Sequence, residues 1–196
     1  MASTYISAAP VASANGYVTS VAMKNGAYTL AATAPTSGAR KVTCTRTVVG
    51  GADTPGTIAV VGRDLAGQTI TETLTPGAHT ILVTGTKFFA SVESVTGAGW
   101  ATATGDDTIV VGWDATCVVA TGSGKLWGIV ITETAAGIIT ISDYARTLAV
   151  FKASIVEGTY EFPGGLEYSG YLKIDPAAAS KLTVLHTGSQ PVYSTT

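Results

Sequence analysis

GTIAVVGRDLAGQTITETLTPG, residues 56–77, holds two stretches rich in β-branched side chains around a short polar link. Residues 57–61 and 68–75 have the length and composition of strands, and residues 62–67 supply the turn between them. Ile70 and Leu74 share one face of the second strand with Glu72. A single carboxylate on an apolar face is typical of a sheet edge, with a buried interface partner as the alternative. The segment predicts a β-hairpin.

The composition of the whole chain favours strands over helices. Its 196 residues include 32 threonines and 23 glycines, and only 12% are charged. Branching at Cβ suits a pleated sheet, and glycine supplies turns. Strands are predicted at residues 28–32, 41–48, 57–61, 68–75, 79–83, 88–95 and 108–113, and again at 126–132, 137–142, 147–152, 159–162, 168–174 and 181–186. This spacing predicts an all-β protein with antiparallel sandwiches of the immunoglobulin-like or jelly-roll-like kind.

The two series of predicted strands show an internal likeness. PGTIAVVGRD at 55–64 is similar to AGIITISD at 136–143, and DDTIVVGW at 106–113 is similar to SKLTVLH at 180–186. This likeness favours two related sandwich modules, and a single larger sandwich is the alternative. The predicted organisation is an extended N-terminal arm (1–20), a first sandwich (21–114), a linker (115–125), a second sandwich (126–190) and a tail (191–196).

Charge and hydropathy exclude several classes of function. The formal net charge is −2, and the 11 Lys and Arg residues form no cluster, so we expect no nucleic-acid binding. No apolar run approaches the roughly 20 residues of a membrane-spanning helix, and the first residues lack the pattern of a secretory signal. Cys44 and Cys117 have no metal-site spacing, and we expect two buried free thiols rather than a disulfide, as in a reducing cytoplasm.

No motif in the chain predicts catalysis, a cofactor or a metal ion. GSGK at 122–125 lacks the first glycine and the final Ser or Thr of a phosphate-binding loop, so a flexible turn is expected. The pair Asp106 and Asp107 lacks the acidic ladder of a calcium loop and predicts a solvated turn. His79 and His186 stand alone in strand-like contexts and are interpreted as structural.

One alternative function depends on the tryptophans. Trp100, Trp113 and Trp127 could together form an aromatic platform for a sugar, although core or interface packing is the commoner use of this side chain. Thr-x-Thr pairs are too irregular for an ice-binding face.

The hairpin and the segments after it resemble virion structural proteins of tailed bacteriophages. The resemblance is carried by Gly56, Asp64, Gly67, Glu72, Lys87, Phe89, Val92 and Val111-Gly112, and by GKLWGIVIT, GIITISD, GGLEYSG and LTVLH further on. It covers most of residues 40–188 and transfers no catalytic residue. It implies a non-enzymatic virion part made in the host cytoplasm. The expected role is a head decoration or cement protein that contacts major capsid protein or other virion subunits, with homo-oligomer formation. A tail or head–tail junction protein, or a cell-surface or carbohydrate-binding module, is the alternative.

The predicted arm supplies the candidate contact residues. Its sizeable apolar side chains are Tyr5, Ile6, Val11, Tyr17 and Val18. We expect them to dock on a neighbouring subunit, where burial offsets the entropy of ordering the arm. The alternative is that the arm folds back as an edge strand on its own sandwich.

Overall fold

The computed structural model describes residues 2–6, 12–35, 38–49, 53–101, 107–133, 136–177 and 181–187, with only the backbone of residues 2–6. These residues contain no helix, and every strand pair among them is antiparallel, so the prediction of an all-β protein is confirmed. The strands are β1 (Ala2–Ile6), β2 (Ser13–Ala22), β3 (Gly26–Ala27), β4 (Ala39–Thr47), β5 (Thr54–Arg63), β6 (Thr69–Leu74), β7 (Leu82–Phe89), β8 (Ser91–Ala101), β9 (Thr108–Thr121), β10 (Gly124–Glu133), β11 (Ile139–Ser142), β12 (Thr147–Phe151), β13 (Gly158–Tyr168), β14 (Tyr171–Pro176) and β15 (Lys181–His186).

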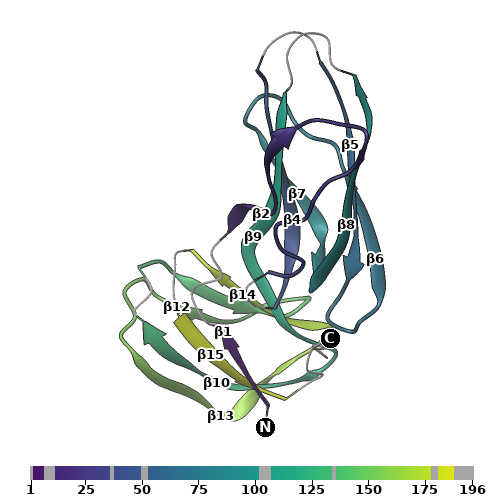
Figure 1. The fold of residues 1–196 in the computed structure, drawn as a ribbon. Coiled ribbons are helices and arrows are strands. Elements are labelled where there is room, and N and C mark those ends of the chain that lie inside the picture. The colour runs from purple at the N-terminus through teal and green to yellow at the C-terminus, as the bar shows by residue number, and fades with distance from the viewer. Residues whose placement is uncertain are drawn as a thin grey trace.

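The strands form two sandwiches, here called module 1 and module 2, which lie one above the other in Figure 1. In module 1 the layer β2-β9-β4-β7 faces the layer β3-β8-β5-β6. In module 2 the layer β1-β15-β10-β13 faces the layer β9-β14-β11-β12. Strand β9 belongs to both modules, because its first part pairs with β2 and its last part, residues 117–121, pairs with β14. One seven-stranded sheet therefore runs through the whole molecule.

The two modules have the same strand connectivity. Replacing β4 to β9 by β10 to β15 in order reproduces every pairing among β4 to β9: β4–β7, β4–β9, β5–β6 and β5–β8 become β10–β13, β10–β15, β11–β12 and β11–β14. The sequence likenesses fall on equivalent strands, β5 with β11 and β9 with β15. The molecule is thus a tandem repeat of one β-sandwich.

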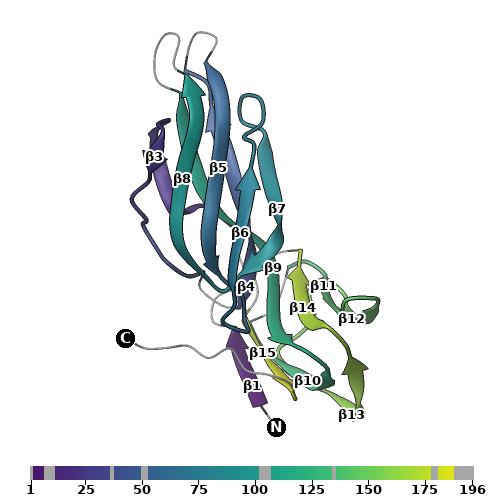
Figure 2. The same ribbon diagram turned by 90° about the vertical axis from the view of Figure 1, so that its right-hand side faces the viewer.

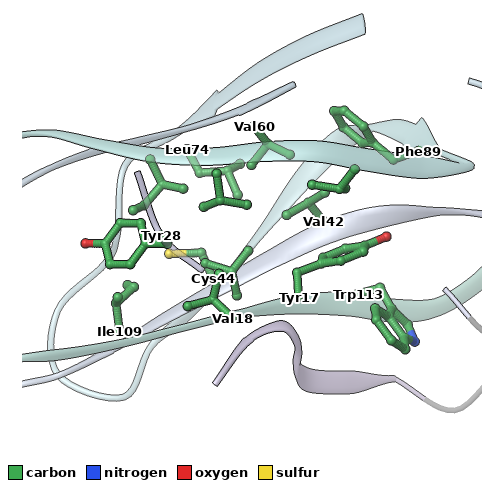
Figure 3. Packing of buried hydrophobic residues seen from close by; sticks show 14 of the residues in the cluster. Tyr17, Val18, Tyr28, Val42, Cys44, Val60, Leu74, Phe89, Ile109 and Trp113 are labelled. Atoms are coloured by element: carbon green, nitrogen blue, oxygen red, sulfur yellow. The ribbon is translucent and has the colours of Figure 1, made fainter. Parts of the chain in front are cut away.

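Each module has its own hydrophobic core. In Figure 3 the core of module 1 is seen between its two layers. Its largest members include Tyr17, Ile58, Phe89, Trp100, Ile109 and Trp113. The core of module 2 is built from Leu126, Ile129, Ile131, Ile139, Ile141, Leu172, Ile174, Leu182 and Val184, among others. Alternate side chains of each strand supply both cores, as expected for sheets with one buried face.

The structure differs from the predicted organisation at the arm and the linker. Most of residues 1–20 belongs to the fold, since β1 pairs with β15 and β2 pairs with β9. Residues 115–125 are not a linker, because β9 continues to Thr121 and β10 begins at Gly124, with a two-residue turn between them. The predicted tail, 191–196, and residues 188–190 lie outside the described residues.

Four predicted strands are misplaced for identifiable reasons, and one of them, at 168–174, spans the turn at Ser169 and Gly170 between β13 and β14. Residues 28–32 are not a strand, although Tyr28 donates its N–H to Val95 O at 2.9 Å. Residues 79–81 form a turn, closed by the Ile81 N–H to Ala78 O bond, so β7 begins only at Leu82. The predicted strand at 88–95 spans Ala90, where the chain leaves one layer of the sandwich for the other. Corners of this kind interrupt pairing without a clear break in the sequence pattern.

The edge of module 1 is closed by the carboxylate of Glu72, as its sequence position predicted. Edge strand β6 carries Glu72, whose Oε1 accepts a 2.5 Å hydrogen bond from the Thr86 N–H and a 2.9 Å bond from its hydroxyl. Thr86 lies on β7, the edge strand of the opposite layer. Gly85 leaves room for the carboxylate, since a Cβ there would lie 2.3 Å from Glu72 Oε2. Glu72 therefore bridges the two open edges of the sandwich.

A small third cluster joins the modules and is called the seam. It contains Ala39, Leu65 and Val118, with Phe88, Ala90 and Tyr171 packed against it. Leu65 directly follows Asp64, the first residue after β5, and it is only 5% exposed. Tyr144 is the repeat equivalent in module 2, because it directly follows Asp143 after β11, and it is 77% exposed. Equivalent turns thus carry a buried residue in module 1 and an exposed one in module 2, where the Tyr144 ring packs edge-to-face on Tyr171, 6.0 Å between centroids.

Replacing Leu65 by alanine tests the contribution of the seam to stability. We expect Leu65→Ala to lower the free energy of unfolding by about 2–3 kcal/mol, because a buried leucine leaves a cavity. The matched variant Tyr144→Ala should change it by less than about 1 kcal/mol. Urea unfolding followed by tryptophan fluorescence measures both, and a loss below about 1 kcal/mol in Leu65→Ala would show that the seam contributes little packing energy.

Candidate partner-binding surfaces

The structure places the five predicted contact residues in three different situations. Tyr17 and Val18 are 0% and 2% exposed in the core of module 1, where Figure 3 shows Tyr17 beside Trp113. Their ring centroids are 4.9 Å apart in an edge-to-face arrangement. Tyr5 and Ile6 lie in β1, in register with Thr183 and Leu182. Val11 lies outside the described residues. Tyr17 and Val18 therefore serve the fold and present no surface to a partner, which corrects the prediction for this pair.

Exposed apolar side chains gather at the end of module 1 opposite the seam. Val49, Ile81 and Leu82 are 64%, 54% and 56% exposed, and they are called the distal patch. Strand β4 runs from the seam towards this end, and its Thr45 pairs with Leu82. The Thr80 N–H donates to Arg46 O at 2.8 Å, and the Val48 N–H donates to His79 Nδ1 at 2.9 Å. These bonds hold the two segments of the patch side by side.

A buried carboxylate anchors the backbone beneath the distal patch. Asp107 is fully buried, and its Oδ1 accepts the Val49 N–H at 2.9 Å. Its Oδ2 lies 3.5 Å from the Arg46 guanidinium, an ion pair shielded from water on both sides. Asp107 was expected in a solvated turn, and burial against Arg46 corrects that expectation. Asp106 lies outside the described residues. Since the carboxylate carries a charge-assisted bond, the segment of Val49 is firmly positioned.

The turn that presents Ile81 is strained. Thr80 has φ of 58°, a conformation that β-branched residues rarely adopt. Its hydroxyl donates to His79 O at 2.8 Å, which helps to hold that conformation. Strain of this kind costs about 1–3 kcal/mol and persists where the surrounding structure enforces it. The turn thus keeps two large apolar side chains in solvent at an energetic cost.

A concave surface lies on module 2. It is an open cleft of about 580 Å³, lined by residues of three segments: Ser123 to Lys125, Asp143 to Arg146, and Glu167 to Ser169. Asp143 lies at its base, 6% exposed. Its Oδ1 accepts the N–H groups of Ala145 and Arg146, both at 2.8 Å. Its Oδ2 accepts the Ser169 N–H at 3.3 Å.

The polar groups of this cleft are engaged within the protein. Burial alone would raise the pKa of Asp143, but the three N–H donors and the Arg146 charge outweigh it and lower the pKa. Arg146 donates to Glu167 O at 3.0 Å, and Lys125 donates to Gly164 O at 3.2 Å while lying over the Trp127 ring. The carboxylate therefore builds a turn, and the cations around it support the cleft walls.

The cleft occupies the place in module 2 that the seam occupies in module 1. Gly38 and Gly124 are equivalent, since a Cβ on either would meet the neighbouring carbonyl, Val118 O or Thr187 O. The next residues along the chain, Ala39 in module 1 and Lys125 in module 2, are therefore equivalent as well. Their partners, Val118 beside Ala39 and Thr187 beside Lys125, also correspond. Apolar residues at the seam are thus replaced by polar ones at the free end. Polar outer faces of this kind are typical of terminal repeats.

The other residues singled out in the sequence have structural positions. GSGK forms the turn between β9 and β10, with Gly122 at φ of 80°. Cys44 and Cys117 are buried free thiols, as predicted. Trp100 and Trp113 lie in the core of module 1, whereas Trp127 is partly buried in module 2, so the three form no common sugar platform. His79 accepts the Val48 N–H, and His186 is fully buried in module 2.

Among the described residues, no three His, Cys, Asp or Glu side chains come together in a metal-binding arrangement. The described part of the chain also has no helix suited to crossing a membrane.

The geometry defines a class of protein, a tandem β-sandwich with an apolar distal patch and a polar free end. Comparisons with protein-family models, with curated proteins and with solved structures find no match to this chain. Sequence reasoning missed the distal patch. Its one visible signal was the apolar pair Ile81-Leu82 directly after the polar pair His79-Thr80.

Asp143→Asn tests the buried turn. We expect a loss of about 1–2 kcal/mol in the free energy of unfolding at pH 7, because a charged acceptor of three N–H groups is removed. The pKa of Asp143 is lowered by folding, so its stabilisation is complete above about pH 4 and disappears as pH falls through the native pKa. The difference between the two proteins should therefore be constant from about pH 5 to 8 and shrink below about pH 4. Urea unfolding at several pH values measures it, with Asp64→Asn, which alters the more exposed equivalent turn, as the milder control.

The buried histidine of module 2 gives a test of how stability depends on pH. Burial lowers the pKa of His186, with a backbone hydrogen bond at Thr187 acting in the opposite direction. The unfolded chain therefore takes up a proton near pH 6.5 while the folded chain does not, and acidification favours unfolding with a slope of at most about 1.4 kcal/mol per pH unit. His186→Gln should flatten this fall in stability between pH 7 and 5.5, whereas Val156→Gln, at an exposed and non-titrating position of module 2, should preserve it. An unchanged slope in His186→Gln would show that the histidine does not titrate differently on folding.

Proposed function

We propose that this protein is a non-enzymatic structural component of a tailed-bacteriophage particle, specifically a head decoration protein that contacts major capsid protein subunits. The proposal joins the resemblance of residues 40–188 to virion proteins with one structural observation. That observation is the distal patch, where Val49, Ile81 and Leu82 are exposed on a backbone fixed by buried Asp107. Exposed apolar side chains that cluster mark contact surfaces more often than scattered ones do.

The shape and chemistry of the molecule support attachment by the end of module 1. The distal patch and the polar cleft lie on different modules, on either side of the seam that joins them. Module 2 also exposes apolar side chains, so what favours the distal patch as the contact is its backbone, which Asp107 holds in place. With 12% charged residues, close contact requires little desolvation of charge.

The location of the protein in purified particles is the direct test. Cryo-electron microscopy of the phage that carries this gene should show the two sandwiches on the outer surface of the head, with module 1 against the shell. Density on the tail or at the head–tail junction would replace the decoration role by the alternative virion role. Absence of the protein from complete particles would overturn the proposal.

Substitution of the distal patch tests the mode of attachment. Particles stripped of the protein should release their genome at a lower temperature than complete ones, and added wild-type protein should restore the higher temperature. Leu82→Asp should bind stripped particles about tenfold more weakly, a loss of about 1.4 kcal/mol, because a charge replaces an apolar contact. Val156→Asp is the matched control, since Val156 is 68% exposed but lies on module 2. Equal binding by both variants would show that module 1 does not attach by this end.

A further inference from the structure

The repeat reveals one strand that is out of chain order. In module 1 the outer edge of β9 is covered by β2, which the chain supplies just before the other strands of that module. The equivalent edge in module 2 belongs to β15, and it is covered by β1, from the opposite end of the chain. Figures 1 and 2 both show β1 on module 2 beside β15, whereas β2 lies on module 1. None of the strands β10 to β15 that build module 2 covers this edge of β15, so β1 occupies it.

The edge of β15 requires a partner strand because it borders the core. Leu182, Val184 and His186 are all fully buried, so the backbone between them lies next to the interior of module 2. Unpaired N–H and C=O groups at such an edge are costly and attract another strand. Five residues of β1 satisfy it in an antiparallel ladder that runs from Ala2 opposite His186 to Ile6 opposite Leu182.

We propose that this edge is an acceptor slot that β1 of a second copy of the chain can fill, giving a reciprocally exchanged dimer. A main-chain ladder is the same whichever copy donates the strand, so exchange loses none of the β1–β15 pairing. Only residues 7–12, which include Pro10, separate β1 from β2, and β2 stays in module 1. The balance between the closed monomer and the exchanged dimer is therefore set by concentration.

This inference concerns self-association and goes beyond the proposed virion role. It needs neither the distal patch nor a capsid, because all of its contacts lie between β1 and β15. The partner is defined by backbone geometry and register rather than by charge. Failure of the particle experiments would leave it intact, and its own failure would leave the virion role intact.

Disulfide trapping between different chains tests the exchange. Tyr5 and Thr183 are register partners, so one chain carries Tyr5→Cys and the other carries Thr183→Cys. A bond between these two positions can then form only across two copies, and the native thiols of Cys44 and Cys117 are buried. The two chains are unfolded together under reducing conditions and refolded at about 1 µM and at about 500 µM, a range over which mass action favours the dimer. Mild oxidation is applied only after refolding, when Cys44 and Cys117 are buried again. Gel electrophoresis without reductant and mass spectrometry identify the bonded pair.

The proposal predicts a covalent heterodimer joined at positions 5 and 183, abundant at the high concentration and scarce at the low one. Replacing Thr183→Cys by Val156→Cys, an exposed position that β1 does not pair with, should abolish the bond and controls for random collision. A single chain with both Tyr5→Cys and Thr183→Cys should close within itself at the low concentration, which verifies the register. If that chain closes and the mixed chains form no heterodimer at the high concentration, the proposal is wrong.

Light scattering gives an independent readout that needs no added cysteine. The unmodified protein, refolded at the high concentration, should contain dimer, and Thr4→Pro should remove it, because proline lacks the N–H and disfavours the ladder. A dimer that persists in Thr4→Pro would be held by another surface and would overturn the proposal. A protein that is wholly monomeric after refolding at the high concentration would do the same.

Discussion

The path of β9 depends on a bulge that is held by a buried guanidinium. Arg40 pairs with Cys117 and Val42 with Trp113, so β9 has extra residues opposite β4 at this point. The Asp114 carbonyl there accepts a 3.2 Å hydrogen bond from Arg40, which is fully buried. Burial lowers the pKa of Arg40, and the nearby Cys117, Asp114 and Tyr17 act in the opposite direction. A bulge bends its strand, and a partnered charge inside the protein fixes the bend.

The consequence of that bend is one strand shared by two sandwiches. Before the bulge, β9 pairs with β2 and β4 in module 1. After it, β9 still pairs with Ala39 and Arg40 of β4, and it also pairs with β14 of module 2. The carboxylate of Asp114 takes part as well, since its Oδ1 accepts the Lys41 N–H at 3.3 Å while burial raises its pKa. Because β9 carries pairing on both sides of the bulge, the modules are joined by a continuous sheet, and the seam around Leu65 packs against it.

The two modules share one strand topology, but different side chains cover their open sheet edges. Val60 pairs with Glu72, and Ile139 pairs with Phe151, four residues before the equivalent turns at Asp64 and Asp143. Glu72 closes the edge of module 1 by bonding to β7. Phe151 closes the edge of module 2 by edge-to-face packing on Tyr160, 5.5 Å between centroids. Connectivity is therefore retained by the alternating core pattern, while edges and ends are free to become polar or apolar.

The sequence pattern predicted those parts of the fold that depend on interactions between residues close together in the chain. The hairpin at 56–77 is formed by β5 and β6, and β15 begins and ends at the predicted residues. Turn chemistry at Asp64 and Asp143 was visible as an acidic residue after each of two similar strands. The continuation of β9 into module 2 was not predicted, because Thr121 to Gly124 looked like the centre of a linker. The pairing of β9 with β14 joins residues far apart in the sequence, so the local pattern does not show it. Burial of Tyr17 and exposure of Leu82 were equally hidden, since both depend on which layer a strand joins.

Two of the three connections between the modules are independent of β1. The continuous strand β9 and the seam both lie within residues 38–177, whereas the β1–β15 ladder ties the start of the chain to module 2. Withdrawal of β1 would open the edge of β15, but it would leave β9 paired with β4 and β14 and Leu65 packed against its neighbours. The architecture therefore concentrates its structural integrity in β9 and leaves the first strand as the one element that can pass to a neighbour without separating the modules. The exchange proposed for β1 would therefore leave both hydrophobic cores of each copy in place.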